Sequence, residues 1–358
     1  MEAASVPTSP PSPRRSKART AALRDAASKY GLILFLLILP VAYGIQDLQQ
    51  DGNLVGLANN LFAGVSNGAI WAMIAIGYTL VYGIIELINF AHGDNFMIGS
   101  FVSFGLFGTL GLTLATGTLG LVVGLLVCLI VSMVVCGSLN VMIERVAYKP
   151  LRNAPKLAPL ITAVGFSFIL QNVGILWLGG SPVGIPDLID AQHTVVTIFG
   201  VEVTNADLLA IVVTIPLVVV LTAFINHSRL GKAMRATAQD PEAARLMGIN
   251  VDTTISLTFL LGGLMAGAAG LIYALYQTTV WFFQGFQAGL IAFTAAVMGG
   301  IGNIQGAVLG GLVIGCIQQI SDSRIGAQWT PAIVFGYLVV IMVFRPQGLL
   351  GEETREAG

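Results

Sequence analysis

The chain has 358 residues, of which 55 % are hydrophobic and only 10 % are charged. Soluble domains carry about 25 % charged residues, so this composition excludes an ordinary soluble domain and predicts a membrane protein. The net charge of −1 is spread unevenly over the loops, and we expect no nucleic-acid partner. The three cysteines, Cys128, Cys136 and Cys316, lie inside apolar segments without metal-ligand spacing, which predicts small hydrophobic side chains and no metal site.

The amino-terminal region differs from the rest of the chain. Residues 1–29 are rich in Pro, Ser and Arg, which predicts a disordered, basic, cytoplasmic tail. The apolar run after it is preceded by too long a region, and followed by no clear cleavage site, for a signal peptide. We therefore expect a retained first membrane helix, a permease domain over residues 30–350 and a short cytoplasmic tail over 351–358.

Ten apolar segments follow one another along the chain and predict an all-α polytopic protein with about 8–10 transmembrane or half-membrane helices. They lie near 30–45, 57–85, 96–112, 118–142, 158–178, 207–226, 253–277, 287–299, 305–320 and 330–345. Ten segments divide into a 5+5 inverted repeat, an arrangement typical of transporters. In each half we expect a polar, Gly-containing interruption, at 86–95 in the first and 299–306 in the second.

Basic residues predict the direction of the chain, because Lys and Arg gather in cytoplasmic loops. They are frequent in the tail, in the loop 144–156 and in the loop after residue 226, whereas 46–53 and 179–206 carry none. Ten crossings of the plasma membrane with both termini in the cytoplasm fit every one of these loops except for Arg324.

The stretch 83–100, GIIELINFAHGDNFMIGS, interrupts the apolar pattern with polar residues. Polar groups at membrane depth usually face a cavity or a partner. We interpret Asn89, His92, Gly93 and Asp94 as a structured break that lines or gates a pathway; a plain cytoplasmic loop is the alternative. His92 has no second ligand at a suitable spacing, so we expect no metal there.

A second interruption contains Gly299, Gly300, Gly302 and Asn303. Unwound membrane helices free backbone carbonyls and amides, which bind zwitterions in other transporters. We expect these four residues to belong to the same pathway or gate. Elsewhere, glycine pairs spaced by four residues predict tight helix contacts: Gly120/Gly124, Gly263/Gly267, Gly306/Gly310 and Gly311/Gly315.

The predicted cytoplasmic loop 227–252 reads as a docking element. Asp240 followed by Pro241 is typical of a helix start, and Gly248 is typical of a helix end. Between them PEAARLM predicts a short helix with an apolar stripe of Ala243, Leu246 and Met247. A short capped helix presented to the cytoplasm suits contact with another protein.

This segment, EAARLMG, resembles the coupling motif of ABC importer permeases, whose short helix fits a groove on an ATPase subunit. Together with INFAHGDNFMIG, ERVAYKPLR and RPQGLL, it resembles the branched-chain amino acid importer permeases of the LivH type over residues 57–350. The resemblance implies that the ATPase-coupling residues are Glu242, Ala243, Ala244, Leu246 and Gly248. It also implies cytoplasmic ATPase subunits, a second homologous permease subunit and an extracytoplasmic substrate-binding protein as partners.

The resemblance predicts an ATP-driven importer of branched-chain or other apolar amino acids. The chain has no phosphate-binding loop of the form GxxxxGK[ST], so ATP would be bound by the partner and we expect no cofactor in this chain. No nucleophile–base pair appears either, and we expect no enzyme and no catalytic residues. The alternatives are a permease for urea or short amides, a self-sufficient ion-coupled carrier using Glu86, His92 and Asp94, and a channel-like pore.

Overall fold

The structure, a computed structural model, describes residues 31, 35–50, 52–152, 154–155 and 157–351. The predicted tail at 1–29, and that at 351–358 except for Gly351, lie outside the described residues. Each of the ten predicted apolar segments contains a helix. These helices are residues 35–50, α2 (Val55–Ile85), α3 (Ala91–Thr109), α4 (Thr118–Ile143), α5 (Leu157–Leu178), α6 (Asn205–His227), α9 (Val251–Gln277), α10 (Gln284–Gly299), α11 (Ile304–Arg324) and α12 (Thr330–Phe344).

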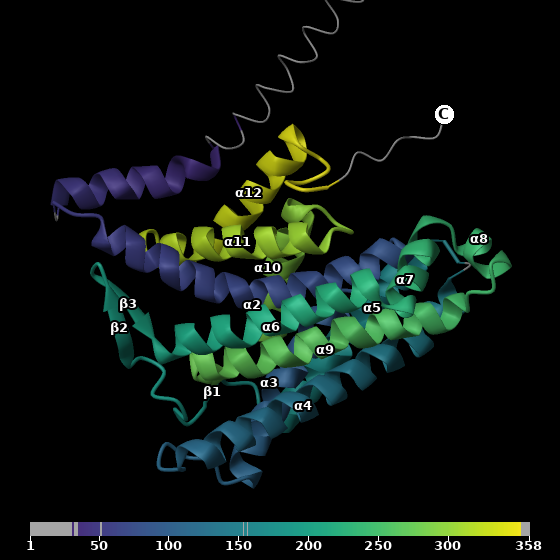
Figure 1. Ribbon diagram of the computed structural model, residues 1–358, viewed down its shortest axis with the longest axis horizontal. Helices are drawn as coiled ribbons and strands as arrows, with labels where there is room; N and C mark the ends of the chain where they lie inside the picture. The colour runs from purple at the N-terminus through teal and green to yellow at the C-terminus, as the bar shows by residue number, and fades with distance from the viewer. Residues whose placement is uncertain (1–30, 32–34, 51, 153, 156, 352–358) are drawn as a thin grey trace, which may run out of the picture.

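Six helices among the described residues are long and apolar enough to cross a membrane, namely α2, α4, α5, α6, α9 and α11, and α12 is a shorter apolar helix. An all-α polytopic membrane protein is therefore confirmed. Short elements fill the connections: the π-helix η1 (Glu144–Tyr148), the 3-10 helix η2 (Lys149–Leu151), α7 (Arg229–Gln239) and α8 (Pro241–Leu246). Figure 1 shows α7 and α8 together at one end of the bundle, which we call the α8 end.

Four short strands lie toward the opposite end. β2 (Thr194–Ile198) and β3 (Val201–Thr204) form an antiparallel hairpin, with Gly200 in its turn at a φ of 85°. We call this end the hairpin end (Figure 1). β1 (Val183–Gly184) pairs with β4 (Thr279–Val280), so the long loop after α5 is tied to the residues that follow α9.

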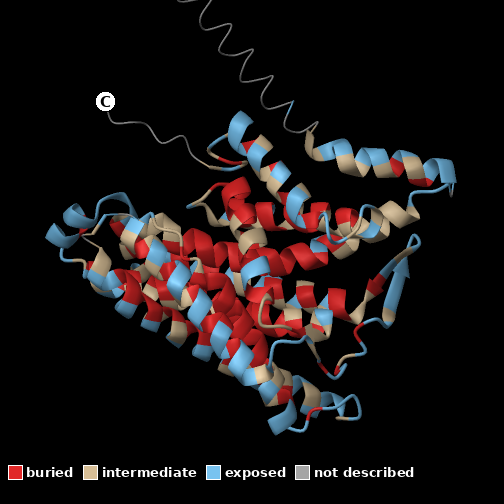
Figure 2. Cartoon of the chain, turned by 180° about the vertical axis from the view of Figure 1, so that it is seen from behind, coloured by how far each residue is buried: buried red, intermediate tan, exposed pale blue. Residues whose placement is uncertain are grey.

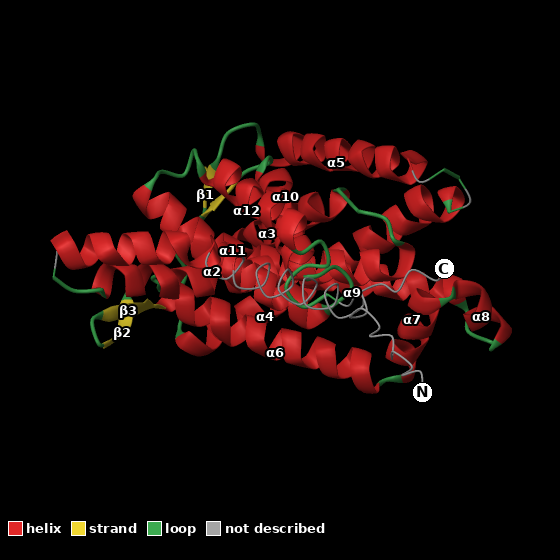
Figure 3. Ribbon diagram, turned by 90° about the horizontal axis from the view of Figure 1, so that it is seen from above, coloured by secondary structure: helices red, strands yellow, loops and turns green. Residues whose placement is uncertain are grey.

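The core of the bundle lies around α2 and α9. In their most apolar stretches 78 % and 72 % of the residues are buried, against 22 % for α4 and α6. The buried residues follow the central helices, and the outer helices expose apolar side chains (Figure 2). Seen from above, α5 and α6 lie at opposite edges of the bundle (Figure 3). An apolar exterior of this kind fits lipid as the surrounding solvent.

Glycines set how closely the helices pack. A Cβ added to Gly311 of α11 would lie 2.5 Å from the Cα atom of Ala72 in α2. Gly263 and Gly267 hold α9 against the backbone of α4, and Gly306 and Gly310 hold α11 against α10, in the same way. Three of the four predicted glycine pairs thus make close helix contacts. The pair Gly120/Gly124 does not, because the neighbours of both glycines are side chains of the loop before α4.

The predicted break at 86–95 is shorter in the structure. α2 ends at Ile85, Glu86 takes a left-handed φ of 52°, and α3 begins at Ala91. His92, Gly93 and Asp94 therefore lie in the first turn of α3, not in an irregular segment. The reason is that these residues are buried, and backbone groups away from water must bond within the chain, which a helix achieves at once.

A helix end that resembles the one at Glu86 occurs after α9. Thr278 ends α9 with a left-handed φ of 50°, close to that of Glu86 at the end of α2. The chain then forms β4 and enters α10 at Gln284. The stretch 299–306, which we expected to match the first break, instead connects α10 to α11.

Candidate functional site

At the α8 end, the six-residue helix α8 has the predicted caps. The Asp240 carboxylate accepts hydrogen bonds from the backbone N–H groups of Glu242 and Ala243, both at 2.9 Å. Pro241 occupies the first helical turn, and Gly248 takes a φ of 84° just after the helix. These caps make α8 a defined element, because they satisfy end groups that would otherwise have no partner.

The sides of α8 have different surroundings. Ala244 is 4 % exposed and belongs to the apolar cluster that contains Tyr148 and Phe259. Leu246 and Met247 are 89 % and 83 % exposed. The predicted stripe of Ala243, Leu246 and Met247 is therefore exposed as a whole, whereas Ala244, which was not part of it, faces the bundle. Large apolar side chains grouped at the tip of a domain are typical of a protein contact.

α7 connects α8 firmly to α6. A Cβ added to Gly231 would lie 1.9 Å from the carbonyl oxygen of Ile225, so α7 approaches the end of α6 as closely as backbones allow. The Arg235 guanidinium donates to the carbonyl oxygens of Ile225 and Asn226. Met234, one turn after Gly231 on the same face of α7, is also buried. These contacts join α7, which directly precedes α8, to the end of α6.

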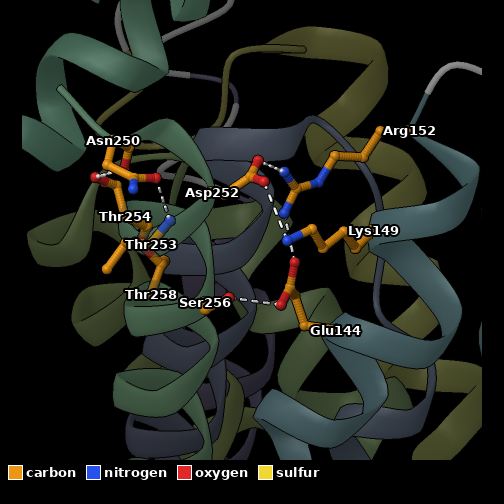
Figure 4. Close-up of polar contacts among 9 residues, drawn as sticks. All are labelled: Glu144, Lys149, Arg152, Asn250, Asp252, Thr253, Thr254, Ser256 and Thr258. Carbon is orange, nitrogen blue, oxygen red and sulfur yellow. Dashed lines mark hydrogen bonds and ion pairs between the residues drawn. The ribbon is translucent and has the colours of Figure 1, made fainter. Parts of the chain in front are cut away.

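A charge cluster around the buried Glu144 joins the end of α4 to the start of α9 (Figure 4). Glu144 is fully buried; it accepts from the Arg152 guanidinium and, at 2.7 Å, from the Ser256 hydroxyl. Arg152 also pairs with Asp252 at 2.5 Å, and Lys149 pairs with Asp252 at 3.1 Å. We call Glu144, Lys149, Arg152, Asp252 and Ser256 the charge clamp. It fixes η1 and η2 to the first turns of α9, which follow α8 directly.

Inside the bundle, the break at 86–90 is held by asparagines. The Asn89 amide donates to the side-chain oxygen of Asn140 at 3.1 Å, and the Asn140 amide donates to the carbonyl oxygen of Phe259 at 2.6 Å. The Asn95 amide donates to the Cys136 carbonyl oxygen at 3.0 Å. Three helices, α3, α4 and α9, therefore meet through side-chain amides around the break.

Asp94 and His92 occupy separate buried positions. Asp94 accepts a hydrogen bond from the Ser167 hydroxyl of α5 at 2.5 Å, and Gln171 donates to Ser167 at 3.1 Å. The His92 ring lies edge-on to Tyr78 with the ring centroids 4.9 Å apart. Within the described residues, no cluster of three His, Cys, Asp or Glu side chains is arranged to hold a metal ion.

Gly93 permits a close crossing of α3 and α10. A Cβ added to it would lie 2.3 Å from the carbonyl oxygen of Gly285 and 2.6 Å from the Cα of Gly289. Asn89, His92, Gly93 and Asp94 thus lie in one buried region, but they contact different neighbours.

The other predicted gate residues form the turn between α10 and α11. Gly300 and Gly302 have φ values of 112° and 93°, and Asn303 caps α11 by accepting from the backbone of Gln305 and Gly306. The carbonyl oxygens of Met298 and Gly299 accept from the backbone N–H groups of Leu349 and Leu350. Of the four predicted residues, Gly299 therefore has its carbonyl oxygen bonded to the carboxy-terminal segment.

The two predicted gate regions approach each other through apolar residues. Ile88 of the first break and Ile301 of the second line one small space of about 10 Å³, together with Tyr78, Tyr82 and Phe293. A cavity of this size holds about one water molecule. The structure thus brings the two regions together across an apolar contact.

Comparisons with known proteins agree with this architecture. The family described as "Branched-chain amino acid transport system / permease component" matches residues 60–343. The chain belongs to this permease family. The high-affinity branched-chain amino acid transport system permease protein LivH of Escherichia coli (strain K12) is 40 % identical over 299 residues, covering 83 % of this chain and 96 % of that protein.

Other relatives show the same similarity. The permease protein BraD of Pseudomonas aeruginosa is 40 % identical over 300 residues, with 83 % and 96 % of the two chains covered. A probable LivH permease of Methanocaldococcus jannaschii is 26 % identical over 301 residues, with 79 % and 89 % covered. No solved structure matches the chain significantly. The expected LivH-like membership is confirmed, and so is a multi-pass membrane permease.

Several structural residues escaped the sequence analysis. Asn140 is a lone amide in an apolar helix, which is a usable signal because such residues bond to other helices. Glu144 and Arg152 carried the signal of positions in a loop rich in charge, but Asp252, the second partner of Arg152, lies 100 residues further along the chain. Tyr78 gave no signal in the sequence.

Proposed function

We propose that this chain is the membrane-spanning permease subunit of an ATP-driven ABC importer for branched-chain or other apolar amino acids. The observation that carries the proposal is α8: a capped helix that exposes Leu246 and Met247 while Ala244 anchors it to the core. An ion-coupled carrier or a pore needs no such docking helix in the cytoplasm. The names of LivH and BraD, which assign those proteins to branched-chain amino acid transport systems, support the substrate class.

The partners follow from this proposal. ATPase subunits would bind α8 and hydrolyse ATP, a second homologous permease subunit would complete the pathway, and an extracytoplasmic protein would deliver the substrate. We place the α8 end in the cytoplasm, because Arg145, Lys149, Arg229, Lys232 and Arg245 all belong to elements or loops at that end. Both termini would then also be cytoplasmic, in the plasma membrane.

Helix pairing supports the 5+5 inverted repeat as part of the proposal. If α2, α3, α4 and α5 are exchanged for α9, α10, α11 and α12, the contacts exchange as well. The pair α2–α11 becomes α9–α4, α3–α4 becomes α10–α11, and α3–α5 becomes α10–α12; all six pairs are in contact. Left-handed ends at Glu86 and Thr278 add a local match. Two halves of this kind alternate access by moving against each other.

The mechanism we infer is a rigid-body switch. Closure of the ATPase pair would displace α8, and the contacts of α7 and the charge clamp would carry that displacement into α6 and α9. Since α9 holds Asn140 and thereby Asn89, the first break would move relative to Ile301. ATP need only bind the partner in a way that favours one of the two states, by a few kcal/mol.

Reconstitution tests the proposal. Proteoliposomes containing the chain, its homologous permease, the ATPase pair and the binding protein should take up leucine only with internal ATP. Glu242→Ala on α8 should reduce that uptake about tenfold, while Glu202→Ala, an exposed carboxylate of the hairpin end, should leave it unchanged. Uptake without ATP would favour the ion-coupled carrier instead, and transport of urea but not leucine would favour the amide permease.

A further inference from the structure

A cavity of about 480 Å³ opens between the end of α4, η1, η2 and the first turns of α9. It lies beside the charge clamp of Figure 4. Its lining combines basic groups, hydroxyl groups and apolar side chains with one carboxylate, that of Asp252, which is paired with Lys149 and Arg152. The first three kinds are represented by Arg145, Lys149, Thr253, Ser256, Leu257 and Leu260. None of the residues that form the proposed coupling helix or gate lines this space.

The charges around the cavity favour an anion. The clamp carboxylates Glu144 and Asp252 are already paired, with Arg152 and Lys149. Arg145 is exposed, and no ion pair or hydrogen bond of its side chain occurs within the described residues. Three basic side chains face two carboxylates, which leaves one positive charge, on Arg145 at the rim. A phosphate can therefore pair with Arg145 without breaking an existing ion pair.

The position of the cavity along α4 indicates where the anion comes from. The outer face of α4 is apolar: Val134 and Met142 are 55 % and 46 % exposed. This face ends at Arg145 and Lys149. In a membrane helix, the point where an apolar outer face gives way to basic residues lies at the level of the lipid headgroups.

We propose that this cavity binds the phosphate headgroup of an anionic phospholipid, with Arg145 as the principal cation and with the Thr253 hydroxyl donating a hydrogen bond, while the Ser256 hydroxyl stays bonded to Glu144. One acyl chain would lie against Leu257 and Leu260. Basic pockets between membrane helices at the cytoplasmic surface bind such headgroups. A lipid seated here contacts both helices that the charge clamp joins, so it would stabilise the clamp. This inference requires a membrane but not the proposed transport activity.

Lipid binding to the purified full-length chain tests the proposal directly. The chain is placed in micelles that contain phosphatidylglycerol or phosphatidylcholine, and bound lipid is counted by native mass spectrometry. We expect retention of phosphatidylglycerol in preference to phosphatidylcholine. Arg145→Gln should weaken it about fivefold, since each basic residue near an anionic surface contributes ~1 kcal/mol. Arg229→Gln, an exposed arginine at the same end outside the cavity, should not.

A second variant distinguishes lipid binding in the cavity from non-specific electrostatic attraction to the surface. Ser138 lines the cavity from α4 and is exposed, so Ser138→Phe fills the space without changing charge, and it should also reduce phosphatidylglycerol binding. Equal effects of Arg145→Gln and Arg229→Gln, or binding that ignores Ser138→Phe, would overturn the proposal. Full competition by millimolar inorganic phosphate would likewise overturn it, and would assign the cavity to a soluble anion.

Discussion

The side-chain oxygen of Asn140 accepts from Asn89, and its amide donates to the carbonyl oxygen of Phe259, so one side chain of α4 links the break before α3 to the middle of α9. Hydrogen bonds between membrane helices contribute about 0.6 kcal/mol on average and up to ~1.7 kcal/mol. A side chain that makes two such bonds to two different segments is an efficient way to hold a break in place.

Removing that side chain should destabilise the protein measurably. We expect Asn140→Ala to lower the free energy of unfolding by about 1–3 kcal/mol, because both the Asn89 amide and the Phe259 carbonyl lose a partner. The measurement is thermal or denaturant unfolding in detergent. Asn172→Ala is the matched control, because Asn172 is exposed and bonds only to Phe168 of its own helix. Equal loss in both variants would contradict the linking role of Asn140.

The close crossing of α2 and α11 predicts a sharp difference between two glycines. Gly311→Ala should destabilise by about 1–3 kcal/mol, since its Cβ would overlap the backbone at Ala72 and the helices would have to separate. Gly336→Ala in α12 meets no neighbour within 4 Å, and should be neutral or slightly stabilising because Ala favours helices. Melting temperatures of the two variants in the same detergent provide the check.

The charge clamp predicts that one substitution lowers the stability of the fold and that a second substitution restores it. Arg152→Met leaves Glu144 buried with its charge uncompensated, which should cost about 3–5 kcal/mol of stability. The double variant Glu144→Gln with Arg152→Met should recover most of it, because no buried charge remains. Lys232→Ala, an exposed cation of α7, controls for a general effect of removing positive charge. Chemical unfolding of all three variants decides the point; no recovery in the double variant would argue against a paired Glu144.

Substitutions on the exposed side of α8 should impair transport activity without impairing folding. Leu246→Glu combined with Met247→Glu should leave the melting temperature unchanged, since both side chains are largely exposed. ATP-dependent uptake should fall at least about tenfold, because an apolar contact with the ATPase subunit is replaced by charge. Loss of stability along with uptake would show that these residues pack within the permease itself.

Much of the fold was predictable because its signals are local. The caps at Asp240 and Gly248 depend on residues within one turn, and the hairpin around Gly200 depends on its turn residue. Apolar segments likewise predicted each membrane helix, since lipid demands long apolar runs. Boundaries next to polar residues were less certain: His92 and Asp94 look like loop residues, yet burial between α2, α5 and α10 places them in a helix.

The site was predictable only in part, for a related reason. Glu242 to Gly248 form a local motif, and its resemblance to coupling helices was specific. The pairing of Asp94 with Ser167, and of Arg152 with Asp252, joins segments far apart in the chain, and no local pattern reports such contacts. In the same way, nothing near Gly299 indicated that Leu349 and Leu350 would bond to that turn. The roles of the predicted gate residues stay predictions.

The apolar contact between Ile88 and Ile301 has a consequence for the energetics of the cell. A space of about 10 Å³ admits about one water molecule, and a single water cannot form the continuous chain along which protons travel. In this conformation the subunit seals that point of the bundle against ion and proton leak. If the chain is the permease subunit proposed above, a resting state closed at this point would leave the membrane potential available to other transporters.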